Sequence, residues 1–131
     1  MPRILIADDS ATIRKMVRAS LQPLDGPEFL EAATGLEAIE QLAIAAVHLI
    51  VLDLNMPDMH GIDVLRFVRG QQQYRNLPVI VLTTRGDDAS REMAIEAGAT
   101  TYLTKPFAPQ TLAATARTLL NRVEPSASHA W

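Results

Sequence analysis

The chain of 131 residues is long enough for one domain with a single hydrophobic core. Its 12 basic and 15 acidic residues give a formal net charge of -3 without a long block of one sign, so nothing in the sequence predicts binding to nucleic acid or to an anionic membrane. The lack of cysteine excludes disulfides, thiolate metal ligands and cysteine nucleophiles, and it suits the reducing cytoplasm, where we expect the protein to reside.

Neither the N-terminus nor any internal run predicts insertion into a membrane. The acid pair Asp8-Asp9 follows only four apolar residues, which is too short a run for a signal peptide. The longest apolar stretch, residues 42–52, is interrupted by His48 and is about half of the ~20 residues that a membrane span needs.

Short apolar runs alternate with longer segments whose apolar residues recur at helical spacing, a pattern that predicts parallel strands joined by helices. The first predicted strand, residues 4–7, ends at Asp8 and Asp9, and Ser10 can cap the helix that follows. One face of this helix is predicted to be buried and the other to meet water. The predicted buried residues are Ile13, Met16, Val17 and Leu21, and the predicted water-facing ones are Arg14, Lys15 and Arg18.

A second strand is predicted over residues 28–33, and its short, more polar sequence suits the edge of a sheet. Thr34 and Glu37 form a capping box that opens the second helix. The predicted buried face of this helix comprises Leu36, Ile39, Leu42 and Ala43.

The third predicted strand, residues 48–54, is aliphatic from Leu49 to Leu54 except for Asp53. This pattern indicates a strand covered on both faces, inside a parallel sheet. Pro57 cannot continue the ladder, so pairing is expected to stop just after Asp53. Because chemistry in open parallel sheets collects at the carboxyl ends of the strands, Asp53 is a candidate functional residue.

The second half of the chain repeats this alternation. Strands are predicted at residues 78–83 and 101–104, and helices from Ile62 to Gly70, from Asp87 or Asp88 to Gly98 with Met93, Ala94 and Ala97 buried, and from Pro109 to Val123. Residues 1–123 are therefore predicted to form one α/β domain, a (βα)5 doubly wound sheet of five parallel strands in three layers. The composition changes at Glu124, and residues 124–131 are predicted to be a tail or the start of a linker.

Polar groups of different kinds follow successive strands and should meet at one rim of the sheet. They are Asp8 and Asp9 after the first strand, Asp53 after the third, Thr83 and Thr84 after the fourth, and Lys105 after the fifth. Two carboxylates ~4 Å apart repel by about 4 kcal/mol at an effective dielectric near 20, so three of them require a cation. With only oxygen ligands present, a hard ion such as Mg²⁺ or Mn²⁺ is expected, and such a site is suited to a phosphate.

Lys105 is one of only two lysines in a chain with ten arginines. A compact ammonium at a strand end suits a single phosphoryl oxygen or a carboxylate. Its position therefore supports the same prediction as the three acids.

These motifs together resemble the receiver domain of two-component response regulators, in its single-domain, CheY-like form. The resemblance covers residues 3 to about 123 and rests on the acid pair, the Asp53 block ending in Met56-Pro57-Asp58-Met59-His60-Gly61, Thr83, and Lys105-Pro106-Phe107. It implies a flavodoxin-like fold and phosphorylation-dependent signalling. By this resemblance Asp53 accepts a phosphoryl group from a histidine kinase or a histidine phosphotransfer protein and becomes an acyl phosphate.

The resemblance also implies a metal role for the acids. Asp9 and Asp53 would hold Mg²⁺ through their side chains, Asn55 would hold it through its backbone carbonyl, and Asp8 would act mainly through water. Mg²⁺, or another divalent cation such as Mn²⁺, is thus the cofactor that we expect.

Four groups would bind the phosphoryl oxygens, again by resemblance: the Lys105 ammonium, the Thr83 hydroxyl and the backbone N–H groups of Asn55 and Thr84. The Lys105-Pro106 bond resembles the cis peptide of the family, which would aim the ammonium into the site.

A conformational switch is implied between Thr83 and Tyr102. Movement of Thr83 toward the phosphoryl group would let Tyr102 turn inward and reshape the face of the fourth helix, fifth strand and fifth helix, where a downstream protein would bind. An aromatic residue near a sheet edge can also serve packing alone. Asn55 and Arg85 match variable family positions that control water access, so Arg85 is expected to affect autodephosphorylation.

Three other functions are weighed against a stand-alone regulator of chemotaxis, motility or a phosphorelay. A phosphohydrolase of the haloacid dehalogenase type carries a second acid two residues after its nucleophile, where this chain has Asn55, and has a cap domain. A nucleotide or flavin module would need a glycine-rich loop after the first strand, which is missing. A receiver-like scaffold that works without phosphorylation stays open. Catalysis is expected to be limited to phosphoryl acceptance and hydrolysis of the domain's own phosphoryl group.

Overall fold

In the computed structural model, which describes residues 2–84 and 88–128, strands and helices alternate from end to end. The strands are β1 (Arg3–Ala7), β2 (Glu28–Ala32), β3 (Leu49–Asp53), β4 (Val79–Thr84) and β5 (Thr101–Lys105). They pair in parallel in the order β2-β1-β3-β4-β5. The aliphatic strand β3 is therefore central and buried throughout, while the polar strand β2 lies at an edge, as the sequence predicted.

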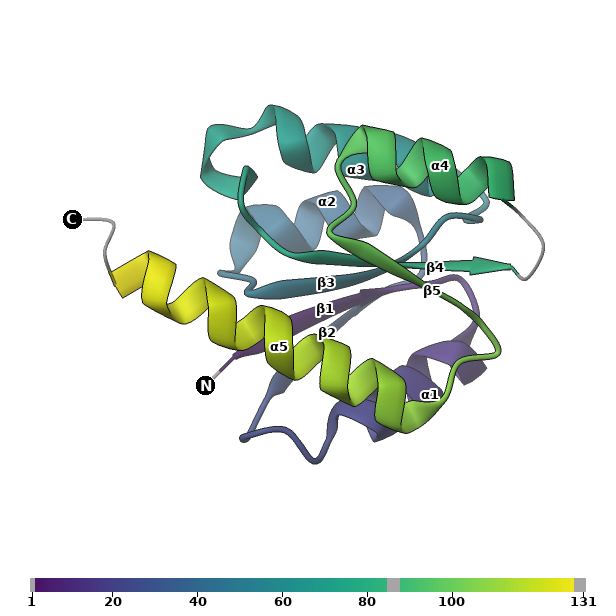
Figure 1. Ribbon diagram of the computed structural model, residues 1–131. Coiled ribbons are helices and arrows are strands. Elements are labelled where there is room, and N and C mark those ends of the chain that lie inside the picture. Colours follow the sequence, from purple (N-terminus) through teal and green to yellow (C-terminus); the bar gives the residue numbers. More distant parts are fainter. Residues whose placement is uncertain (1, 85–87, 129–131) are drawn as a thin grey trace.

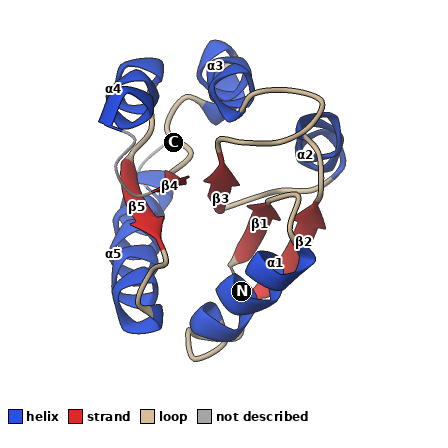
Figure 2. Cartoon of the chain, turned by 90° about the vertical axis from the view of Figure 1, so that its right-hand side faces the viewer, coloured by secondary structure: helices blue, strands red, loops and turns tan. Residues whose placement is uncertain are grey.

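The helices are α1 (Ala11–Leu21), α2 (Gly35–Ile44), α3 (Gly61–Gly70), α4 (Asp88–Ala97) and α5 (Pro109–Ser128), and a short 3-10 helix, η1 (Gln72–Tyr74), follows α3. Figure 1 shows α1 and α5 on one face of the sheet and α2, α3 and α4 on the other. The same three layers are seen from the end in Figure 2. The predicted (βα)5 doubly wound fold is confirmed.

Each face of the sheet has its own hydrophobic core, because successive side chains of a strand point to opposite faces. Leu5, Ile50 and Leu52 pack toward α2, α3 and α4. Ile4 and Val51 pack toward α1 and α5. The central strands are thus fixed from both sides, and so are the positions at which they end.

Side chains cap three of the helices. Ser10 accepts a hydrogen bond from the Ile13 N–H at the start of α1, and Thr34 accepts one from the Glu37 N–H at the start of α2. The Glu37 carboxylate reaches the Ala33 N–H at 2.8 Å, one residue before the expected partner of a capping box. At α3 the cap is His60, whose Nδ1 accepts from the Ile62 N–H.

The predicted apolar faces were partly wrong. Met16, Leu36 and Met93 are 41%, 55% and 48% exposed, and Ala43 is exposed as well. The reason is that each helix meets the sheet along a narrow line, which admits fewer residues per turn than the apolar pattern offers. In α1 the buried residues are Val17, Ser20 and Leu21, and the Ser20 hydroxyl donates to the Met16 carbonyl at 2.7 Å.

Some predictions fall at or beyond the edges of the described chain. Asp87 and Arg85 lie outside the described residues, as does the end of the predicted tail. The backbone of α5 is helical to Ser128, past the composition change at Glu124, and the domain boundary near residue 123 stays a prediction. None of the helices in the described ranges is long and apolar enough to cross a membrane.

Candidate functional site

The carboxyl ends of four strands bring the predicted site residues together. Asp8 directly follows β1, Asp53 is the last residue of β3, and Lys105 is the last residue of β5. The register pairs Asp53 with Leu82 and places Thr83 one residue further along β4. Residues far apart in the sequence therefore share one rim, which faces the viewer in Figure 2.

Lys105 links the two buried acids of this rim. Its Nζ lies 2.9 Å from Asp8 Oδ2 and 3.2 Å from Asp53 Oδ1. Asp8 and Asp53 are only 1% and 3% exposed, whereas Asp9 is exposed. One carboxylate oxygen from each of these three aspartates lies within 4.8 Å of the others. The site therefore holds three negative charges and one positive charge in a small volume.

Burial and neighbouring charges shift the pKa values of Asp53 and Lys105. Burial, and then the Asp8 carboxylate, raise the pKa of Asp53 above its usual 3.8, although Lys105 and a hydrogen bond from the Asn55 backbone N–H act in the opposite direction. Burial lowers the pKa of Lys105, but the hydrogen bond to Asp8 and the two carboxylate charges outweigh it and leave this pKa raised. The Lys105 ammonium is thus a stable cation, while the negative charge of the Asp53 carboxylate is not fully compensated.

The donor set fits a divalent metal ion. All the available ligands are oxygens, and the acids outnumber the one ammonium among them. The side chain of Asp8 is engaged by protein donors, because Oδ1 accepts from the Ser10 N–H and Oδ2 from Lys105. That Asp9 and Asp53 would hold the metal directly and Asp8 mainly through water stays a prediction.

Thr83 contributes a buried hydroxyl without a partner. The residue is 2% exposed, and no group in the described part of the chain hydrogen-bonds to its Oγ1. A buried polar atom left unpaired costs about 1–3 kcal/mol, which favours a role in binding over a role in the fold. The side chain of Thr84, one residue later, is exposed.

The loop between β3 and α3 is held close to the site by local contacts. A Cβ on Gly61 would lie 2.6 Å from the Asp53 carbonyl oxygen and 2.6 Å from Leu54 Cα, so only glycine allows this approach. The Asp58 carboxylate accepts from the N–H groups of Gly35 and Leu36 at 2.9 and 3.0 Å. This contact fastens the loop to the first turn of α2.

On β5 the predicted cis bond between Lys105 and Pro106 is confirmed. Tyr102 is 36% exposed, and the Arg91 guanidinium carbon lies 5.3 Å from the centre of its ring. This outward position is compatible with the expected switch, whose motion stays a prediction. The prediction for Arg85 concerns a residue outside the described ranges.

Sequence reasoning missed Arg14, which it placed in water. The Arg14 side chain is 18% exposed, pairs with Glu31 and donates to the Asp8 carbonyl. It also missed Asp58 as an anchor. Both contacts depend on which segments the fold brings together, and helical spacing carries no signal for them.

Comparison with known proteins identifies the family. Residues 4–117, which include all the site residues described above, match the response regulator receiver domain family. The chain belongs to this family. The resemblance suggested by the sequence motifs is thereby confirmed.

The receiver domain is 39% identical over 111 residues to the chemotaxis protein CheY1 of Helicobacter pylori, across 84% of this chain and 90% of that protein. It is 36% identical over 125 residues to the phosphate regulon transcriptional regulatory protein PhoB of Escherichia coli, across 95% of this chain and 54% of PhoB. The solved structure of the chemotaxis response regulator CheY4 of Vibrio cholerae matches with a TM-score of 0.83 at 39% identity, covering 91% of this chain and 98% of that chain. Similar domains thus occur as chemotaxis proteins and within a longer transcriptional regulator.

Proposed function

We propose that this receiver domain accepts a phosphoryl group on Asp53 from the phosphohistidine of a histidine kinase or histidine phosphotransfer protein. The observation that carries the proposal is the setting of the Asp53 carboxylate. It lies 3.2 Å from the Lys105 ammonium, within 4.8 Å of a carboxylate oxygen of both Asp8 and Asp9, and at the end of the central strand.

In the proposed reaction, an Asp53 carboxylate oxygen attacks the phosphorus in line with its bond to the imidazole nitrogen. The new O–P bond replaces the N–P bond, and the nitrogen leaves with the bonding pair and takes a proton from solvent. Later, water hydrolyses the acyl phosphate and returns the carboxylate and inorganic phosphate. The domain's catalysis is limited to these two steps on itself, and it is not proposed as an enzyme for other substrates.

The surrounding groups are suited to the charge of a phosphoryl group. Lys105 would bind one phosphoryl oxygen, and the unpartnered Thr83 hydroxyl and the backbone N–H groups of Asn55 and Thr84 would bind others. Asp9, Asp53 and the Asn55 carbonyl would hold Mg²⁺ or Mn²⁺, which would neutralise charge on the phosphoryl group. The groups that would bind the phosphoryl oxygens lie at, or within two residues of, the carboxyl ends of β3, β4 and β5.

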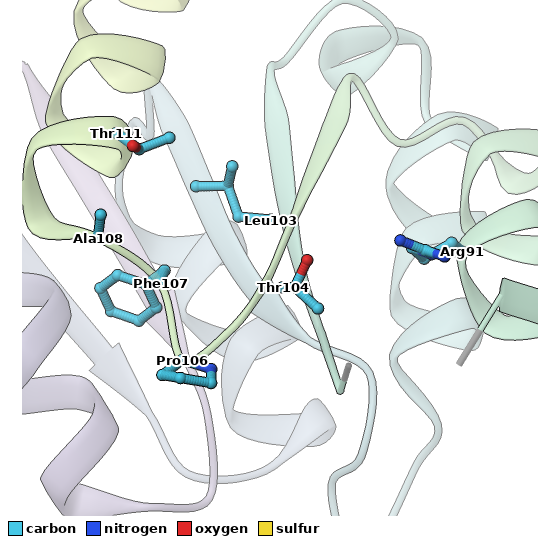
Figure 3. Close-up of a pocket in the computed structure, with 7 residues that line it drawn as sticks. All are labelled: Arg91, Leu103, Thr104, Pro106, Phe107, Ala108 and Thr111. Carbon is cyan, nitrogen blue, oxygen red and sulfur yellow. The ribbon is translucent and has the colours of Figure 1, made fainter. Parts of the chain in front are cut away.

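The output surface is proposed to be the face of α4, β5 and α5. A hollow of about 410 Å³ lies along the edge strand β5, and it is lined by Arg91, Leu103, Thr104, Pro106, Phe107, Ala108 and Thr111. Figure 3 shows Arg91 of α4 on one side of β5 and Phe107, Ala108 and Thr111 on the other. Inward rotation of Tyr102 after phosphorylation would change this face and hence the affinity for a downstream protein.

The proposed setting is a cytoplasmic signalling pathway, either chemotaxis, motility or a phosphorelay. The similarity to chemotaxis proteins over most of this chain supports the first of these. The absence of cysteine suits a reducing compartment.

The test is to incubate the protein with MgCl2 and acetyl phosphate and to follow its intact mass. We expect one added phosphoryl group in the wild type, and none in Asp53→Asn or in the presence of a chelator. Lys105→Gln should reduce the rate of labelling strongly, because it removes the ammonium next to the attacking carboxylate.

Other outcomes would support other functions. Steady consumption of acetyl phosphate without an accumulating adduct would favour a phosphohydrolase. A wild-type protein that remains unlabelled would favour a scaffold that works without phosphorylation.

A further inference from the structure

Asp8 is fixed through all four of its polar atoms. Its N–H donates to the Ala32 carbonyl at 3.0 Å, and its carboxylate accepts from the Ser10 N–H and from Lys105, both at 2.9 Å. Its backbone carbonyl accepts from Arg14 Nη1 at 2.8 Å. Of these partners, Arg14 is the only one that reaches Asp8 from a helix surface.

Arg14 joins the segment that contains Asp8 and Asp9 to the edge strand β2. Its Nε lies 2.8 Å from Glu31 Oε1 on β2, while its Nη1 holds the Asp8 carbonyl. The planar guanidinium fixes the direction of both donors at once. The segment at Asp8 and Asp9 is therefore clamped between β2 and α1, which lie on the same side of the rim in Figure 2.

We propose that Arg14 is a positioning residue for the metal site: by holding the Asp8 carbonyl it fixes the orientation of Asp8 and Asp9 and so increases the affinity for Mg²⁺. This inference rests on the proposed function, because it concerns the same metal. Residues that hold metal-binding groups in place without contacting the metal typically change the metal affinity by about 10- to 100-fold. We expect about tenfold for Arg14, since the Asp8 carbonyl is not one of the proposed metal ligands.

The direction of the change in Mg²⁺ affinity distinguishes a positioning role of Arg14 from an effect of its positive charge. If Arg14 acted through its charge alone, removing this cation near three acids would strengthen the binding of Mg²⁺. A positioning role predicts the opposite. Arg14→Lys keeps the charge, but its single ammonium cannot reproduce the fixed fork, so it should also weaken binding.

Arg18 offers a matched control on the same helix. It pairs with the other oxygen of the same carboxylate, Glu31 Oε2, at 2.5 Å, and its guanidinium lies 5.3 Å from the Phe29 ring centre. None of the hydrogen bonds found in the described residues joins Arg18 to Asp8. Arg18→Gln should therefore lose ion pairing and stability as Arg14→Gln does, while keeping its affinity for Mg²⁺.

The experiment is calorimetric titration of MgCl2 into the unphosphorylated wild type, Arg14→Gln, Arg14→Lys and Arg18→Gln, with thermal unfolding to confirm that each is folded. The expected result is a dissociation constant raised about tenfold by both Arg14 variants and unchanged by Arg18→Gln. Equal affinities in all four proteins, or tighter binding by Arg14→Gln, would overturn the inference and leave the proposed function intact. A wild type that binds no Mg²⁺ would overturn the metal site itself and this role with it. If Arg14→Gln does not fold, Arg14→Lys decides alone.

Discussion

Asp53 places a carboxylate where only 3% of the residue is exposed, and burial followed by the Asp8 charge raises its pKa above 3.8. Without metal, this charge is a cost to the folded state. At neutral pH without Mg²⁺, we expect the free energy of unfolding of Asp53→Asn to exceed that of the wild type by about 1 kcal/mol. Its urea midpoint should therefore be higher. MgCl2 should then stabilise the wild type and leave Asp53→Asn unchanged, because a ligand stabilises only the state that binds it.

The pH dependence has a defined sign. Because the pKa of Asp53 is raised on folding, the folded state binds more protons than the unfolded state between pH 3.8 and the raised value. The contribution of Asp53 to the stability of the metal-free wild type should therefore fall as pH rises through this window. Urea unfolding of the wild type and Asp53→Asn across this range should give curves that converge at its acid end; curves that stay parallel would contradict the assigned cause.

Arg69 is a half-buried charge with a structural role. Its Nε donates to the Gly98 carbonyl at 2.8 Å, and its Nη1 donates to the carbonyls of Leu77 and Tyr74 at 2.7 and 3.1 Å. Burial lowers the pKa of Arg69. Lysine has one ammonium and cannot reach all these carbonyls, so Arg69→Lys should cost about 2–3 kcal/mol in urea unfolding. Arg66→Lys, on the exposed side of α3, should change the free energy of unfolding by a few tenths of a kcal/mol at most.

At this scale the sequence predicted the strand-end residues well and their partners poorly. Asp8, Asp53 and Lys105 meet as expected because the end of a parallel strand is recognisable from a local pattern. Arg14 was predicted to face water, because its contacts with Asp8 and β2 depend on the packing of α1 against an edge strand. Local spacing cannot encode that packing.

Between elements, the Asp58 carboxylate connects the β3–α3 loop to the start of α2 by accepting from the Gly35 and Leu36 N–H groups. These hydrogen bonds lower the pKa of Asp58, so its contribution to stability is present above pH 3.8 and is lost as pH falls through the lowered value. We expect Asp58→Ala to lower the urea midpoint at neutral pH, because two N–H groups of the helix lose their acceptor.

The matched control for this cap is Asp25→Ala, which removes an exposed aspartate in the loop between α1 and β2. Its urea midpoint should match that of the wild type. Equal midpoints for Asp58→Ala and the wild type would show that the loop does not depend on this cap.

The identity and order of the elements were predictable, while the faces of the helices were less so. The strand β3 is apolar except for its last residue, Asp53, and Pro57 follows it, while caps such as Ser10 and Thr34 have a short-range signature. Leu36 and Met93 are exposed because each helix carries more apolar residues than its contact with the sheet can bury. Caps from distant segments, such as Asp58 on α2, have no local signature at all.

At the scale of the whole molecule, the proposed switch connects the phosphorylation site at Asp53 to the face of α4, β5 and α5 through Tyr102. The chain has two tyrosines, Tyr74 and Tyr102, so ring NMR signals of labelled tyrosine report the switch and an internal reference together. The Tyr74 hydroxyl donates to the Leu42 carbonyl at 2.8 Å, away from β5. Mg²⁺ with acetyl phosphate should move the Tyr102 signals and leave those of Tyr74 in place, and Asp53→Asn should abolish the movement.

Arg91 should oppose this motion, because its guanidinium stacks over the outward ring of Tyr102 and also pairs with Asp88. An exposed cation–π contact contributes about 0.5–1 kcal/mol, which corresponds to about a threefold change in the ratio of inward to outward rings. Arg91→Gln should therefore shift the Tyr102 signals of the unphosphorylated protein part of the way toward their phosphorylated positions. Arg66→Gln, on α3, is the control and should leave them unchanged. Tyr102 signals in Arg91→Gln that coincide with those of the wild type would mean that this contact does not hold the ring outward.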